Sequence, residues 1–118
     1  MSMQYKDKQI LQHISNYCKK INMTVSRFGK EFNTFVSDQD YIDSISMNLL
    51  QIGELAGKFS DEYVISTKAD IDWRAIKNMR NMFAHDYNSM DIDRIWETVI
   101  DDIPILEAFC KKQLSEEN

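Results

Sequence analysis

The sequence contains little proline and little glycine, with one Pro and three Gly among its 118 residues. Tight turns and hairpins use both residues heavily, because glycine permits positive φ angles and proline fixes the first corner of a turn. A fold built from β-strands would need many such turns, so this shortage argues against an all-β protein. The length suits one ordinary domain, and we expect residues 1–118 to form a single unit.

Long apolar runs are also missing. No stretch approaches the roughly 20 consecutive apolar residues that a membrane-spanning helix needs. The first residues, Met1 to Lys8, lead directly into a polar helical pattern and do not resemble a secretion signal. These absences predict a cytoplasmic protein with no membrane segment.

The chain has no excess of positive charge. Its formal net charge is -5 and its pI is near 4.9. Proteins that bind nucleic acid without specificity usually present a basic surface. Any contact with RNA would therefore need a local basic patch.

Cysteine is scarce, and the two thiols, Cys18 and Cys110, are far apart in the sequence. Each lies within an apolar helical pattern. Unpaired cysteines in such positions behave as small core residues. We expect two buried thiols, not a disulfide or a pair of metal ligands.

Apolar residues recur at steps of three and four along most of the chain, which is the period of an amphipathic helix. The pattern predicts an all-α fold, an up-and-down helical bundle of about five helices. Pro104 falls inside the last pattern and should distort that helix near Ile100. The expected helices cover about residues 5–21, 25–36 and 38–59, then begin at Trp73 and after the cap residue Asp91.

Three aromatic residues, Phe28, Phe32 and Phe35, share one face of the expected second helix. They could stack on nucleic-acid bases, but stacking aromatics are usually interleaved with basic residues. Only Arg27 and Lys30 are near, so we expect core packing.

Gly53 lies inside the expected third helix, where glycine costs about 1 kcal/mol relative to alanine. Such a position suggests that another backbone or a bulky side chain approaches closely. Glu54 follows in an apolar neighbourhood. Either its carboxylate lies at the edge of the bundle, or it pairs with a buried arginine.

The densest cluster of chemically capable side chains is the segment Arg80–Tyr87, which reads Arg-Asn-Met-Phe-Ala-His-Asp-Tyr. The segment belongs to the expected helix that begins at Trp73. On an ideal helical wheel, one side of this helix is apolar and the opposite side is polar with local positive charge. The apolar side holds Trp73, Ile76, Met79 and Phe83, and the polar side holds Arg74, Lys77, Asn78, Asn81 and His85.

Within this segment, Arg80 falls at the border of the apolar side, where a charge needs a partner or a purpose. Asn81 and His85 are four residues apart and can address one ligand together. Arg80 and His85 are about 140° apart on an ideal helix. They converge on one group only if the helix ends or distorts near His85, or if a second chain completes the site.

The residue types in this segment suit cleavage of a phosphodiester by the RNA 2′-hydroxyl. Arginine binds phosphate with a planar fork of donors, and histidine transfers protons near neutral pH. No second His or Cys lies nearby to hold a metal, and there is no Gly-rich phosphate loop, so we expect neither a metal nor a cofactor. The plainer interpretation is an Arg in an ion pair and a His at a helix C-terminus.

Arg80, His85 and Tyr87 fit the Arg-x4-His-x-Tyr motif, and the chain resembles the HepT-like family of the HEPN superfamily. Asn81, directly after the arginine, also fits. Further similarity comes from Gln51–Glu54, residues 70–74, Trp96 and Pro104, so the resemblance covers nearly the whole chain.

The resemblance implies a homodimer of helical bundles whose two motifs face one another across a cleft. It implies the toxin of a type VII toxin–antitoxin system, a metal-independent endoribonuclease that cleaves RNA. Arg80 and His85 would be catalytic and Asn81 would support them. The implied partner is a small nucleotidyltransferase of the MntA type, an antitoxin that adds AMP to Tyr87. A bulky anion beside the catalytic His would exclude RNA.

A second interpretation is a binding module, in which the chain is a non-catalytic, substrate-binding subunit of a small nucleotidyltransferase. The acidic balance of the chain fits this alternative slightly better. The presence of Arg80, His85 and Tyr87 together favours the nuclease, since a scaffold would not require all three.

Overall fold

The computed structural model describes residues 3–83 and 91–116, and this part of the chain forms helices and no strand. The expected all-α class is therefore confirmed. The elements are α1 (Tyr5–Phe28), α2 (Phe32–Val36), α3 (Gln39–Ala56), α4 (Asp61–Thr67), α5 (Trp73–Lys77), the 3₁₀-helix η1 (Asn78–Met82), α6 (Ile92–Glu97), the π-helical turn η3 (Thr98–Asp102) and α7 (Ile103–Glu116).

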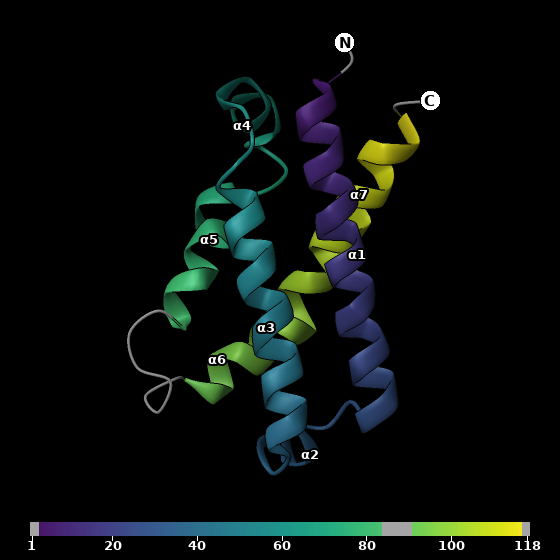
Figure 1. Ribbon diagram of the computed structural model, residues 1–118, viewed down its shortest axis with the longest axis vertical. Helices are drawn as coiled ribbons and strands as arrows, with labels where there is room; N and C mark the ends of the chain where they lie inside the picture. The colour runs from purple at the N-terminus through teal and green to yellow at the C-terminus, as the bar shows by residue number, and fades with distance from the viewer. Residues whose placement is uncertain (1–2, 84–90, 117–118) are drawn as a thin grey trace.

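The helices run up and down along the long axis of the molecule, as expected (Figure 1). Helix α1 descends to the short α2, and α3 returns beside it. Helix α4 lies at the upper end, α5 and η1 descend along α3, and α7 rises again against α1. Within the described residues, no helix is both long enough and apolar enough to span a membrane.

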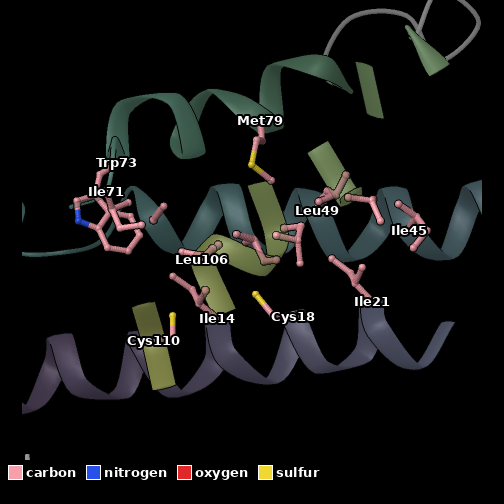
Figure 2. Close-up of a cluster of buried hydrophobic side chains, with 14 of the residues drawn as sticks. Ile14, Cys18, Ile21, Ile45, Leu49, Ile71, Trp73, Met79, Leu106 and Cys110 are labelled. Atoms are coloured by element: carbon pink, nitrogen blue, oxygen red, sulfur yellow. The ribbon is translucent and has the colours of Figure 1, made fainter. Parts of the chain in front are cut away.

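The core lies where α1, α3 and α7 meet, and η1 closes it from one side. Figure 2 shows side chains from all four elements pointing into this space. Met79 enters it from η1 and is 8% exposed. The other labelled core residues are Ile14, Cys18, Ile21, Ile45, Leu49, Ile71, Trp73, Leu106 and Cys110, all of them buried.

The first helix is longer than the sequence predicted. We expected a break at residues 22–24 and a second helix over residues 25–36, but α1 continues to Phe28 and α2 is only five residues long. The chain turns at Gly29, whose φ of 113° is readily adopted only by glycine. Residues 22–24 contain neither Gly nor Pro, so nothing there stops the helix.

The aromatic residues of this region pack together in the core, as predicted. The ring of Phe35 is fully buried and lies 5.0 Å from the Trp96 ring and 5.1 Å from the Tyr41 ring. Phe28 and Phe32 are half-buried against Tyr41 and Trp96. The rings of Phe35, Tyr41 and Trp96 therefore fill the space between α2, α3 and α6. Because Phe35 is buried, it cannot stack on nucleic-acid bases, and that alternative is wrong for this residue.

Residues 60–72 are more regular than expected. The expected helices end at residue 59 and resume at Trp73, but α4 spans Asp61–Thr67 between them. Ser60 caps this helix, because its hydroxyl accepts a hydrogen bond from the Tyr63 amide at 3.2 Å. The helix is stabilised by a contact with α1 that no local pattern could indicate.

That contact is made by Asp7, whose carboxylate is 1% exposed. It accepts hydrogen bonds from the Ser60 backbone amide at 2.8 Å and from the Ser60 hydroxyl at 2.6 Å. The first turn of α1 is thereby tied to the start of α4, 53 residues further along the chain.

Asp7→Ala is expected to destabilise the fold by about 2–3 kcal/mol, because two part-buried donors on Ser60 lose their charged acceptor. Asp7→Asn keeps one acceptor oxygen and should cost clearly less. Chemical denaturation of the three proteins measures the difference. Equal midpoints for wild type and Asp7→Ala would show that this contact contributes nothing.

Pro104 distorts the last helix, as predicted. Residues 98–102 form a single π-helical turn immediately before α7. Proline has no amide hydrogen to donate to the carbonyl of Ile100, and a π-turn is a common way to absorb such a missing bond.

The two cysteines are free and buried, which confirms their predicted role as core residues. Burial, and secondarily the nearby Glu107 carboxylate, raises the pKa of Cys110 to about 12. Burial and then Cys110 itself raise the pKa of Cys18. The thiolate is the reactive form of cysteine, so the folded protein holds both side chains in their unreactive state.

We therefore expect no labelling of the native protein by a maleimide at pH 8, and labelling of both thiols once guanidinium unfolds the chain. Mass spectrometry counts the adducts. Rapid labelling of the folded protein would show that this part of the core opens to solvent.

Candidate functional site

The segment that carries the predicted site begins at α5, which is fixed at its first residues. Asp72 caps the helix, since its carboxylate accepts a hydrogen bond from the Ala75 amide at 3.1 Å. Trp73 follows, and its indole N–H donates to the Thr67 hydroxyl at 2.8 Å. Its ring lies 4.5 Å from the Phe59 ring. The segment is thus anchored to α4 and to the turn that follows α3.

The helix type changes in the middle of the segment. Helix α5 ends at Lys77, and Asn78–Met82 form the 3₁₀-helix η1. The ideal α-helical wheel therefore gives only approximate directions for the residues after Lys77, because a 3₁₀-helix turns by about 120° per residue. The final turn closes where the Phe83 amide donates to the Arg80 carbonyl at 3.1 Å.

Segment α5–η1 still has one apolar side and one polar side, as the sequence predicted. Trp73 and Met79 are buried, and Ile76 and Phe83 are half-buried against the core. The polar side is open to solvent, with exposed side chains at Arg74, Lys77, Asn78 and Asn81.

The backbone of Arg80 lies directly against α3 at Gly53. A methyl group on Gly53 would lie 2.9 Å from the Arg80 amide nitrogen and 3.3 Å from both the Arg80 Cβ and the Ile76 carbonyl oxygen. A separation of 2.9 Å is shorter than side-chain carbons tolerate. The close approach expected at Gly53 is confirmed, and the approaching backbone is that of Arg80.

The Arg80 side chain turns outward and meets Glu54. The distance from Arg80 Nη1 to Glu54 Oε1 is 3.5 Å, and each side chain is 45% exposed. Glu54 therefore lies at the exposed edge of the bundle, which was the first of the two interpretations, and the arginine it pairs with is exposed and not buried. Exposed pairs contribute about 0–1 kcal/mol, so an anion such as a phosphate can displace the carboxylate.

Two of the predicted site residues, His85 and Tyr87, lie outside the described residues. The structure brings together Arg80, Gly53 and Glu54, and it places Asn81 next to Arg80 on the exposed side of η1.

The opposite edge of α5 and η1 borders an open groove of about 430 Å³. The apolar floor includes Met79 and Met82. Among the described residues, helix α3 contributes none to the lining, and the rim is mainly acidic: Asp70, Asp72, Glu97, Asp101 and Asp102, together with the cation Arg94. A groove of this charge repels phosphates and other anions.

Comparison with known proteins identifies relatives that span most of the chain. The profile of a family described as "Ribonuclease HepT-like" matches residues 10–113. A protein of Caldanaerobacter subterraneus subsp. tengcongensis, named "Putative RNase TTE0752", is 30% identical over 107 residues, which cover 91% of this chain and 93% of the relative. "Probable ribonuclease HepT" of Thermococcus cleftensis is 28% identical over 90 residues, covering 75% and 81%. No solved structure matches the chain significantly.

Proposed function

Because this chain belongs to the HepT-like ribonuclease family, we propose that it is an endoribonuclease that cleaves RNA without a metal ion, with Arg80 and His85 as catalytic residues. The observation that best supports the proposal is how Arg80 is held and what its side chain contacts. Its backbone is held against Gly53, while its guanidinium is half-exposed beside a carboxylate that an incoming phosphate can replace.

The proposed reaction uses the ribose of the substrate as the nucleophile. His85 accepts the proton of the 2′-hydroxyl, the 2′-oxygen forms a bond to the adjacent phosphorus, and the bond from phosphorus to the 5′-oxygen breaks. Arg80 stabilises the charge that develops on the phosphoryl oxygens. The leaving 5′-oxygen takes up a proton, so the products carry a 2′,3′-cyclic phosphate and a 5′-hydroxyl.

A homodimer suits this chemistry, because two copies of the motif supply two imidazoles, one as base and one as acid. We propose that the chain acts as such a dimer and as the toxin of a toxin–antitoxin pair. Its partner is then a small nucleotidyltransferase of the MntA type, which inactivates it by adding AMP to Tyr87. The motif Arg80-x4-His85-x-Tyr87 supports this part of the proposal.

The direct experiment is incubation of the purified, partner-free protein with total RNA in EDTA. Cleavage by the wild type that disappears in both Arg80→Ala and His85→Ala supports the nuclease. Intact RNA, together with no toxicity on expression, favours the non-catalytic binding subunit instead.

A further inference from the structure

The polar side of α5 carries two cations, Arg74 and Lys77, that the proposed reaction does not use. Both are exposed. They stand out because the chain as a whole has 19 acidic against 14 basic residues. Their position relative to Arg80 follows from the way this segment packs on α3.

Lys77 and Arg80 lie over two successive glycines of one helix edge. A methyl group on Gly57 would lie 3.5 Å from the Lys77 Cε and 3.6 Å from its Cδ, just as one on Gly53 would meet Arg80. Gly53 and Gly57 are one turn apart on α3 and its C-cap. The aliphatic stem of Lys77 therefore lies over Gly57, and its ammonium group shares with Arg80 the seam between α3 and α5.

Two further exposed cations neighbour these residues in the sequence. Arg74 precedes Lys77 by three residues on α5, and the exposed Lys58 directly follows Gly57. Glu54 is the carboxylate paired with Arg80. The other edge of the same segment faces the acidic groove described above. Segment α5–η1 thus separates a cationic edge from an anionic one.

We propose that Arg74 and Lys77 form a phosphate-binding track that holds the RNA strand next to Arg80. This inference rests on the proposed nuclease function and identifies further substrate-binding residues for it. Arg74 and Arg80 are six positions apart, which is roughly 10 Å along the axis at about 1.5–2.0 Å per residue. A stacked strand rises about 3.4 Å per nucleotide, so the track covers about three nucleotides on one side of the cleaved bond.

Such contacts go to the phosphate backbone, so they add affinity without base preference. Each neutralised phosphate of a single strand contributes a slope of about -0.7 to the dependence of log K on log salt concentration. Lys77→Gln should therefore raise Kd and KM roughly five-fold near 0.1 M salt and reduce the salt slope by about 0.7. A second change, Arg74→Gln, should repeat the effect, while kcat stays within about two-fold.

The test combines fluorescence anisotropy of a labelled RNA oligonucleotide, measured over a salt series, with cleavage kinetics. Lys19→Gln is the matched control, because Lys19 is an exposed lysine on α1, away from this seam. It should leave Kd, KM and the salt slope unchanged. Thermal melts of all variants serve as the control for an intact fold.

The outcomes separate this inference from the proposed function. Suppose that the wild type cleaves RNA but that Lys77→Gln and Arg74→Gln both behave like Lys19→Gln. The phosphate-binding role of Arg74 and Lys77 is then wrong, and the proposed nuclease function is retained. If the wild type binds RNA with the expected loss in these variants but cleaves nothing, the track stands and the nuclease is wrong. If the wild type neither binds nor cleaves RNA, both are wrong.

Discussion

Arg80→Ala is expected to lower kcat/KM for RNA cleavage by about three orders of magnitude while leaving the thermal stability nearly unchanged. Removing one donor that stabilises developing charge typically costs about 10²–10³-fold in kcat, and loss of phosphate binding adds to this. The stability should barely move, because the ion pair with Glu54 is 45% exposed on both sides and such pairs contribute about 0–1 kcal/mol.

Arg80→Lys separates charge from geometry at the same position. Lysine keeps the positive charge but lacks the planar fork that binds two phosphoryl oxygens at once. We expect substrate binding to remain close to that of the wild type, with kcat still reduced by about 10²-fold. Single-turnover cleavage assays measure both parameters. An Arg80→Ala protein that keeps more than a tenth of the wild-type rate would remove Arg80 from the catalytic machinery.

Gly53→Ala is expected to have the second-largest effect, although Gly53 is buried and touches no substrate. The added methyl group would lie 2.9 Å from the Arg80 amide nitrogen and 3.3 Å from the Ile76 carbonyl oxygen. Both of these atoms belong to the backbone and cannot move aside by a side-chain rotation, so α5 and η1 must shift as a whole. A shift of about 1 Å in a catalytic group can cost roughly 10²-fold in rate, and overpacking costs about 1–3 kcal/mol of stability.

Gly57→Ala is the matched control, one turn further along the same edge. Its methyl group would meet the flexible Lys77 side chain at 3.5 Å, an ordinary contact. The Gly57 φ of -75° suits alanine, so stability and kcat should be preserved. If Gly53→Ala folds and cleaves RNA at the wild-type rate, the position of Arg80 does not depend on this close approach.

The long helices could be predicted from sequence because their apolar residues repeat over several turns. Ile45, Leu49 and Ile52 of α3 are all fully buried, as their spacing indicated. The boundary between α1 and α2 could not be predicted, because α1 continues through residues 22–24, where the sequence pattern suggested a break. Thr24 uses its hydroxyl in a 3.3 Å contact with Ser44 on α3, which depends on tertiary packing.

Other features depend on contacts between distant parts of the chain. Helix α4 is tied by Asp7, and the change to a 3₁₀-helix after Lys77 occurs where Gly53 admits the Arg80 backbone. Gly53 and Glu54 could be singled out from sequence, because a glycine and a carboxylate are unusual inside an apolar helical pattern. Their shared partner was not readable, since no sequence rule places residue 80 beside residue 53.

The most direct measurement of the proposed chemistry uses a short RNA oligonucleotide, the partner-free protein and EDTA, with the ends of the products identified by mass spectrometry. We predict cleavage that leaves a 2′,3′-cyclic phosphate and a 5′-hydroxyl, and no cleavage when the nucleotide at the cut position is replaced by its 2′-deoxy form. Cleavage of the 2′-deoxy substrate, a requirement for an added divalent metal, or recovery of the RNA intact would contradict the assignment of Arg80 and His85 as the catalytic groups of a metal-independent ribonuclease.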